Sequence, residues 1–180
     1  MDEFLGRPGW RWIVEPPSWA AERDALTWRC RAQTDFWRVT EGQGARHDGQ
    51  AYVVPVDGDF RLEGIAEATL ADRYDQAGLF VESDERRWLK LGVELDGSPW
   101  LSAVHTNQAS DWSREPTPGL PLRLAVERRD DTVTCSAHLE GAWRLFRILH
   151  LPGPVSVGPY SCAPEGGGFE SSLRDASLAG

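Results

Sequence analysis

The sequence has no apolar run long enough to cross a membrane, which takes about 18 or more consecutive apolar residues. Residues 1–10 lack a basic segment followed by an apolar stretch, so no secretory signal is visible. Cysteine is scarce, and Cys30, Cys135 and Cys162 form no CxxC motif and no Cys-His spacing. Such cysteines are expected to be reduced. These absences predict a cytoplasmic protein without a membrane segment.

Positive charge is also in short supply. The 180 residues carry 19 Lys and Arg against 28 Asp and Glu, which leaves a net charge of −9. Nucleic-acid binding needs cationic patches that release counterions from phosphates, and anionic membrane surfaces attract basic segments. The arginines here are interleaved with acids, as in residues 82–87 and 127–131. We therefore expect neither a nucleic-acid partner nor a membrane partner.

Motifs for metals, nucleotides and common nucleophiles are missing. The four histidines, at 47, 105, 138 and 150, do not cluster at the spacing of zinc ligands. Residues 57–59 resemble a fragment of a calcium loop that lacks the remaining ligands. The glycine-rich phosphate loops and the nucleophile elbow are absent as well. We expect no metal and no cofactor, and the sequence assigns no catalytic residue.

What the sequence has instead is a two-residue apolar period over many short segments. Alternation is found in residues 60–69, 122–127, 132–139 and 145–149, and no segment of useful length keeps a helical period. Turn dipeptides separate these segments: Asp57-Gly58, Asp96-Gly97 and Glu140-Gly141. Many short strands in a chain of this length predict an antiparallel sandwich or barrel. The short Pro- and Gly-rich stretches are interpreted as loops, so residues 1–180 are expected to form a single domain.

Residues 78–97 are the most informative segment, because they predict two antiparallel strands with contrasting faces. Leu89, Leu91, Val93 and Leu95 alternate with Trp88, Lys90, Gly92 and Glu94. Successive side chains of a strand point to opposite faces, so the aliphatic set is expected between two sheets. An aromatic ring, a cation, a bare glycine and a carboxylate in a row are unusual for a solvated face. We interpret them as the floor of a groove on a concave outer face.

Two nearby motifs each have a structural and a functional interpretation. Residues 35–38 (Asp-Phe-Trp-Arg) could form one wall of a sugar site, with Trp37 as a stacking platform and Arg38 beside it. Alternatively, their aromatic rings cap the core while Asp35 and Arg38 form an ion pair. In residues 74–78, Asp75 and Gln76 could bind hydroxyl groups, or Asp75 could cap the turn before a strand.

The segment around Asp111 and Trp112 is similarly open. These residues could line the groove beside Glu94, or Asp111 could accept backbone N–H groups in a structural turn. Glycanases with a sandwich fold often place two acids on one strand as E-x-D-x-x-E. Glu94 and Asp96 begin this pattern, but the third acid is missing. We therefore do not expect a catalytic pair of carboxylates on this strand.

Six short motifs occur in order along the chain: DFWR (35–38), GDF (58–60), YDQAGL (74–79), WLKLGVE (88–94), SDWS (110–113) and VGPYSCAP (157–164). Through them the chain resembles the domain of unknown function 1349 family from about residue 19 to residue 177. This resemblance implies an all-β fold of the concanavalin A-like lectin/glucanase type, a jelly-roll β-sandwich of two antiparallel sheets. It implies no activity, because fold alone does not determine function.

The motifs that are scattered in the sequence are expected to meet in one groove. The candidate ligand-binding residues are Trp37, Arg38, Asp75, Trp88, Lys90, Glu94, Asp111, Trp112 and Tyr160. The ligand expected there is a carbohydrate or a small polar metabolite, because sugar faces stack on Trp while hydroxyls bond to Asp, Glu and Lys. Two alternatives stay open: an enzyme that uses Glu94 as acid or base, and a protein-interaction or regulatory module without a small ligand.

Overall fold

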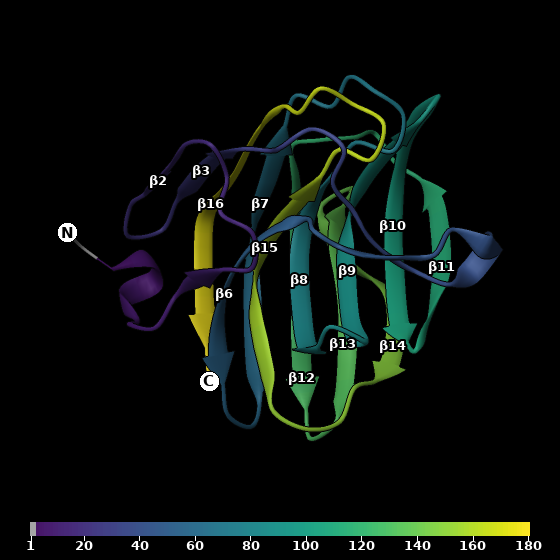
Figure 1. Cartoon of the computed structure of the whole chain (residues 1–180). Helices are drawn as coiled ribbons and strands as arrows, with labels where there is room; N and C mark the ends of the chain where they lie inside the picture. Colours follow the sequence, from purple (N-terminus) through teal and green to yellow (C-terminus); the bar gives the residue numbers. More distant parts are fainter. Residues whose placement is uncertain (1–2) are drawn as a thin grey trace.

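The computed structural model describes residues 3–180, so the first two residues of the acidic N-terminal segment lie outside the described residues (Figure 1). One sheet, called the β9 sheet, has the strand order β1 (Arg11–Trp12), β6 (Gln50–Val56), β15 (Val155–Cys162), β8 (Gln76–Asp84), β9 (Arg87–Asp96), β10 (Ser98–Asn107) and β11 (Ala109–Pro116). The other, called the β7 sheet, has the order β14 (Ala142–His150), β13 (Thr132–Leu139), β12 (Leu122–Arg129), β7 (Phe60–Ala68), β16 (Glu170–Ala179), β3 (Leu26–Arg29) and β2 (Trp19–Ala21).

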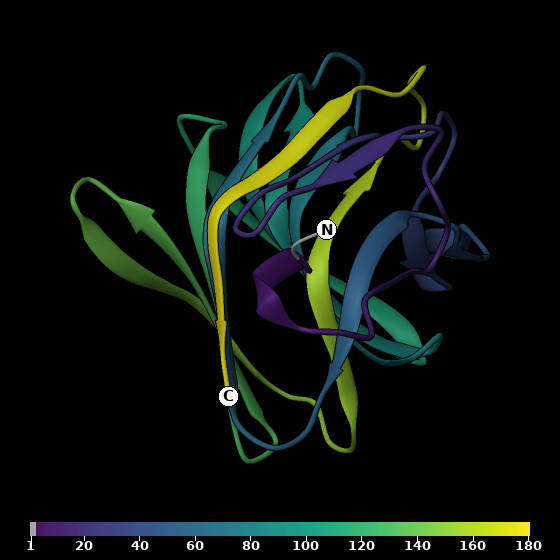
Figure 2. The ribbon, with the colours of Figure 1, turned by 90° about the vertical axis from the view of Figure 1, so that its left-hand side faces the viewer.

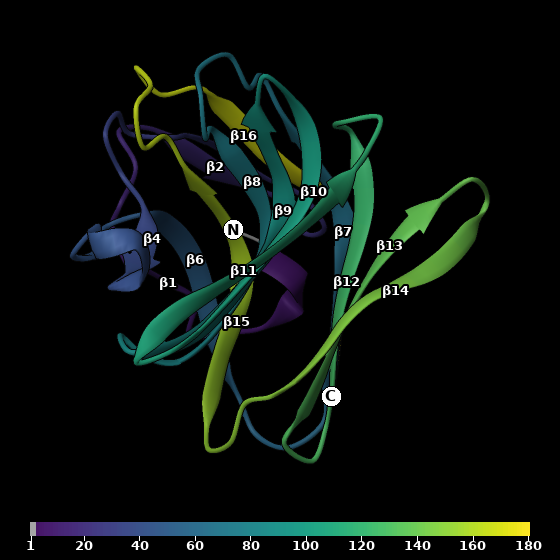
Figure 3. The same cartoon turned by 90° about the vertical axis from the view of Figure 1, so that its right-hand side faces the viewer.

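The two sheets lie face to face, and neighbouring strands in both are antiparallel (Figure 3). The predicted all-β jelly-roll sandwich of the concanavalin A-like type is therefore confirmed. A separate two-stranded ribbon, β4 (Phe36–Arg38) and β5 (Ala45–His47), carries the short 3-10 helix η2 (Thr40–Gly42) in its connection. A second 3-10 helix, η1 (Phe4–Gly6), precedes β1. Among the described residues, no helix is long and apolar enough to span a membrane.

The alternating segments of the sequence are found as strands. Residues 132–139 coincide with β13, and residues 145–149 lie within β14. These two strands form a hairpin that projects beyond the rest of the molecule (Figure 2). The three cysteines are free, as the sequence predicts, and all three are buried.

The aliphatic face of β9 lies in the core between the sheets. Leu89, Leu91 and Val93 are completely buried there, against residues such as Leu62 and Leu124 of the β7 sheet. The prediction for the fourth member, Leu95, is wrong, because this side chain is only half-buried and lies outside the core cluster. Leu95 is the penultimate residue of β9, where the strand leaves the sandwich for the turn at Gly97.

The opposite face of the β9 sheet is covered as well. The ribbon of β4 and β5 lies over it, on the side away from the β7 sheet (Figure 3). Phe36 of β4 stacks on Phe80 of β8 with a centroid distance of 4.4 Å. A second apolar cluster surrounds this pair, with Trp88, Val104 and Tyr160 among its members. The central strands are therefore buried on both faces, which explains why most of β8 and β9 is inaccessible to solvent.

Candidate ligand-binding site

A pocket of about 350 Å³ opens on the outer face of the β9 sheet, beside the β4–β5 ribbon. We call it the Lys90 pocket. Its floor comes from β8 and β9, and its walls come from the ribbon, from β11 and from the loops before β8 and after β15. The lining residues are Asp35, Trp37, Glu41, Gln43, Arg46, Arg73, Tyr74, Gln76, Lys90, Glu94, Trp112, Pro164 and Glu165.

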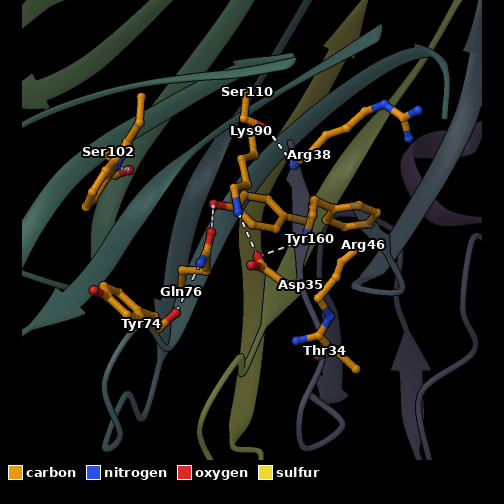
Figure 4. A network of polar contacts seen from close by, with 12 residues as sticks. Thr34, Asp35, Arg38, Arg46, Tyr74, Gln76, Lys90, Ser102, Ser110 and Tyr160 are labelled. Atoms are coloured by element: carbon orange, nitrogen blue, oxygen red, sulfur yellow. Dashed lines mark hydrogen bonds and ion pairs between the residues drawn. The ribbon is translucent and has the colours of Figure 1, made fainter. Parts of the chain in front are cut away.

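Lys90 is the cation of the floor and is only 2% exposed. Its Nζ lies 3.0 Å from Oδ1 of Asp35, at the start of the ribbon (Figure 4). Burial is the largest single influence and would lower the pKa of Lys90, but the charge and hydrogen bond of Asp35 together with the charges of neighbouring groups such as Glu94 outweigh it, so the pKa is raised. Lys90 is therefore charged and already has a partner.

Gly92 separates Lys90 from Glu94 on the same face of β9 and leaves the floor open. A Cβ atom added at Gly92 would lie 2.8 Å from the hydroxyl oxygen of Tyr160 and 2.4 Å from the carbonyl oxygen of Ala77. Any side chain would therefore clash. The close approach of β8 and of the Tyr160 ring explains the glycine in the polar stripe of β9.

Glu94 is the polar group of the floor without a partner. The residue is 4% exposed, and Oε1 is buried and makes no hydrogen bond to another described residue. Burial raises the pKa of Glu94 to about 7, while Lys90 and Arg114 oppose this rise and Asp35 and Asp96 add to it. Near neutral pH the carboxyl therefore exists in both protonation states. It can donate or accept a hydrogen bond, and it can exchange a proton with a ligand.

Two tryptophans form the aromatic wall. The rings of Trp37 and Trp112 meet edge to face, with centroids 6.3 Å apart and an interplanar angle of 90°. Their indole N–H groups bond within the protein, from Trp37 to the carbonyl of Thr40 at 2.9 Å and from Trp112 to the hydroxyl of Ser102 at 2.9 Å. The two rings therefore offer the pocket apolar surface rather than hydrogen-bond donors.

Gln76 and Tyr74 complete the floor on the β8 side. The side-chain amide of Gln76 donates to the carbonyl oxygen of Tyr74 at 3.0 Å and accepts from the Tyr160 hydroxyl at 3.4 Å (Figure 4). Tyr160 is thus fixed beneath the pocket through Gln76. The Tyr74 ring carries the guanidinium of Arg73 at 4.4 Å from its centroid.

The structure brings four of the predicted residues together at the pocket: Trp37, Lys90, Glu94 and Trp112. Trp88 and Tyr160 were expected on the same surface, but both are buried below it and neither lines the pocket. Trp88 is 0% exposed, because the ribbon and Phe36 cover the face to which it points. The predicted contact of Trp88 with a ligand is therefore corrected to a packing role.

The other three predicted residues lie outside the pocket lining. Asp75 caps a turn: its Oδ2 accepts the backbone N–H groups of Ala71 at 3.1 Å and Asp72 at 2.9 Å. Arg38 donates its backbone N–H to the Ser110 hydroxyl at 2.9 Å.

Asp111 is exposed and pairs with Arg147 of β14 at 3.1 Å. For Asp111 neither alternative is found, because it lies outside the pocket lining and pairs with an arginine instead of accepting backbone N–H groups. Asp75 has the structural role, and Asp35 pairs with Lys90 rather than with Arg38.

Sequence reasoning missed the loop residues of the pocket. Glu41, Gln43 and Arg46 come from the ribbon, and Pro164 and Glu165 follow β15. Apart from Pro164, which ends the motif at residues 157–164, these residues follow no period or motif, since only the folding of the loops over the sheet places them at the rim. Asp35, by contrast, belongs to a motif that the sequence singles out. In the described part of the chain, no group of three or more His, Cys, Asp or Glu side chains could hold a metal ion.

Two known proteins are similar to this chain over nearly its whole length. It is 34% identical over 176 residues to "Regulation of enolase protein 1" of Saccharomyces cerevisiae, with 93% of this chain and 87% of that protein covered. It also superposes on a crystal structure described as a functionally unknown protein from Saccharomyces cerevisiae. The TM-score is 0.89 at 31% identity, with 94% of this chain and 95% of that one covered.

More distant structures share the fold at 12% identity. The carbohydrate binding module CBM66 of Bacillus subtilis gives a TM-score of 0.56, with 96% of each chain covered. The GH43 BlXynB protein of Bacillus licheniformis gives 0.72, with 98% of this chain and 38% of that one covered. Residues 12–179 match the family described as "Protein of unknown function (DUF1349)". The chain therefore belongs to the DUF1349 family, as the order of its six motifs indicates.

Proposed function

We propose that this protein binds a carbohydrate or a similar small polar metabolite in the Lys90 pocket. The observation that carries this proposal is the combination of two ring surfaces, Trp37 and Trp112, with a recessed floor of polar groups. Lys90, Glu94 and Gln76 are fixed on rigid strands, so they could bind hydroxyl groups at defined positions. Ligand pockets generally combine apolar walls with a few convergent polar groups, and their volumes start at about 300 Å³.

The distant structural neighbours support the same class of ligand. One neighbour is named a carbohydrate binding module. The other is a GH43 protein, of which this chain matches 38% of the length. At 12% identity these similarities establish the shared fold only. They do not transfer the ligand of a neighbour to this chain. The proposal for this chain therefore depends on its own pocket.

The test is a thermal-shift screen of mono- and disaccharides, followed by calorimetric titration of those that raise the melting temperature. Replacement of Trp37 or Trp112 by Ala should weaken binding by about tenfold, because each removes a ring surface from the pocket wall. Trp143→Ala is the matched control, since Trp143 is an exposed tryptophan on β14 of the other sheet. Equal losses from all three variants, or no sugar that shifts the transition, would contradict the proposal. The second result would favour a protein-interaction module.

A second candidate function is an enzyme that acts on such a sugar through Glu94. It is supported by the buried Oε1 and by the pKa of about 7, which suits a general acid or base at neutral pH. Assays with 4-nitrophenyl glycosides test it. Turnover that Glu94→Gln abolishes without loss of ligand affinity would establish the enzyme, and absence of turnover with every sugar that binds would exclude it.

We also propose a cytoplasmic location, which the three buried free cysteines support. Subcellular fractionation of the tagged protein tests this location. Recovery from an oxidising compartment would contradict it.

A further inference from the structure

The cations of the Lys90 pocket are all held by carboxylates of the protein. Lys90 pairs with Asp35 at 3.0 Å, Arg46 with Asp48 at 3.1 Å and Arg73 with Asp96 at 2.9 Å. A phosphate or carboxylate on a ligand would have to compete with these partners. The pocket therefore offers an anionic ligand no free positive charge.

Three of the four carboxylates that line the pocket show the opposite pattern, and the exception is Asp35, which pairs with Lys90. Glu41, Glu94 and Glu165 line it, and none of them makes an ion pair or hydrogen bond with another residue among 3–180. Glu41 and Glu165 are exposed at the rim, where water solvates them. Glu94 differs, because its carboxyl is buried and Oε1 is left without a partner. A buried acceptor without a hydrogen bond costs free energy that a donor on a ligand would recover.

We propose that the pocket selects ligands with a protonated amine, and that its ligand class is the amino sugars and amino polyols. This inference rests on the function proposed above and narrows it. The ammonium group supplies several N–H donors and a positive charge, which matches a floor and rim with unpaired acceptors. The face of Trp37 adds an attraction for a cation that neutral sugars lack, whereas the guanidinium of Arg114 already lies 4.7 Å from the ring centroid of Trp112. The net charge of −9 favours the approach of such a ligand.

The test compares ligands that differ only in this group. Calorimetric titrations of the full chain at neutral pH and low salt would use glucose, glucosamine, N-acetylglucosamine and glucose 6-phosphate. The corresponding galactose series and the pair sorbitol and 1-amino-1-deoxysorbitol would follow. The amine of each series should bind at least about tenfold more tightly than its neutral partner, as expected for a charged hydrogen-bonded pair. The N-acetyl and phosphate forms should bind no better than the neutral sugar.

Three results would overturn the proposal in different ways. Equal affinity for the neutral and amino forms would refute amine selection and leave sugar binding intact. Tighter binding of the phosphate would show that a pocket cation is available. If no member of any series binds, amine selection and the proposed sugar binding fail together.

Variants locate the source of the preference. Glu94→Gln should reduce the ratio of amine to neutral affinity by about tenfold, because the amide keeps an acceptor but loses the charge. Glu115→Gln is the matched control: Glu115 is an exposed acid of β11 outside the pocket lining, and its replacement changes the net charge equally. The double variant Glu41→Gln, Glu165→Gln changes only exposed rim residues and should lower the ratio by a smaller factor. If every pocket variant keeps the wild-type ratio of amine to neutral affinity, the assignment of the preference to these carboxylates is contradicted.

Discussion

At the scale of single residues, Glu94 shows how burial changes chemistry. The side chain belongs to the polar stripe that the sequence of β9 predicts. Its chemical state, however, depends on the ribbon and on β11, which exclude water around it. Lys90 on the same strand compensates for part of this burial but is already paired with Asp35. Glu94 therefore stays a carboxyl whose proton is held more tightly in the folded protein than in the unfolded chain.

This difference predicts a dependence of stability on pH. The folded pKa of about 7 lies above the ordinary value of 4.5, so the folded state retains a proton that the unfolded state has lost between these limits. Stability from this group is fully present below pH 4.5 and falls as the pH rises towards about 7. The fall should amount to about 3 kcal/mol at most, at 1.36 kcal/mol for each pKa unit.

Urea unfolding at a series of pH values measures the effect. The stability of Glu94→Gln, relative to the wild type, should rise across this interval, because the amide does not ionise. Glu115→Gln should follow the wild-type curve, since Glu115 is exposed. Parallel curves for the wild type and Glu94→Gln would show that the pKa of Glu94 is ordinary.

At the scale of elements, the ribbon of β4 and β5 decides what the outer face of the β9 sheet becomes. Phe36 and Phe80 anchor it through apolar contact, and Asp35 anchors it through the ion pair with Lys90. The side chain of Asp35 also accepts the backbone N–H of Phe36 at 2.8 Å. One short element thus turns half of a sheet face into core and leaves the other half as a pocket.

The contributions of Asp35 and Lys90 to the free energy of unfolding are expected to be strongly coupled, because these residues form the ion pair between the ribbon and β9. Asp35→Asn should destabilise the protein by about 3–5 kcal/mol, because it leaves the charge of Lys90 buried without a partner. The asparagine keeps an acceptor for the Phe36 N–H, so the charge is the main change. Lys90→Met combined with Asp35→Asn should recover part of this loss, since the apolar side chain needs no partner.

Denaturant unfolding of the two single variants and the double variant completes the cycle. Asp84→Asn serves as the control, because the pair of Asp84 and Arg87 is partly exposed and should contribute less than about 1 kcal/mol. Additive losses from Asp35→Asn and Lys90→Met would contradict a coupled buried pair.

At the scale of the whole molecule, charge and connectivity matter most. The core between the sheets draws on residues from Phe4 to Ala176, and we infer from this that residues 1–180 act as one domain that unfolds in a single calorimetric transition.

The net charge of −9 acts over the entire surface. In the pocket, where Trp37 and Trp112 offer ring surface, the cations are paired with acids.

We therefore predict no binding of single-stranded DNA or RNA. Proteins that stack bases combine aromatic rings with a cationic channel that follows the backbone, and here the corresponding cations are neutralised. Fluorescence anisotropy at about 50 mM salt is the strictest test, because low salt strengthens attraction by charge. Micromolar affinity that falls steeply with added salt would refute the prediction.

The sequence by itself determined the strands and the inner face of β9, because both depend on local regularities. Alternation and turn residues act over a few positions, which is why β13 and the burial of Leu89, Leu91 and Val93 follow from the sequence. The ordered motifs likewise identified the family and, through it, the sandwich.

Only the tertiary structure decided what lies over the outer face. A two-residue period tells which side chains share a face, but not which other segment covers them. The ribbon therefore turned Trp88 and Tyr160 into buried residues, and a contact across 55 positions gave Lys90 its partner in Asp35. The rim residues Glu41 and Glu165 reach the pocket through loops, whose course depends on the packing of the whole chain.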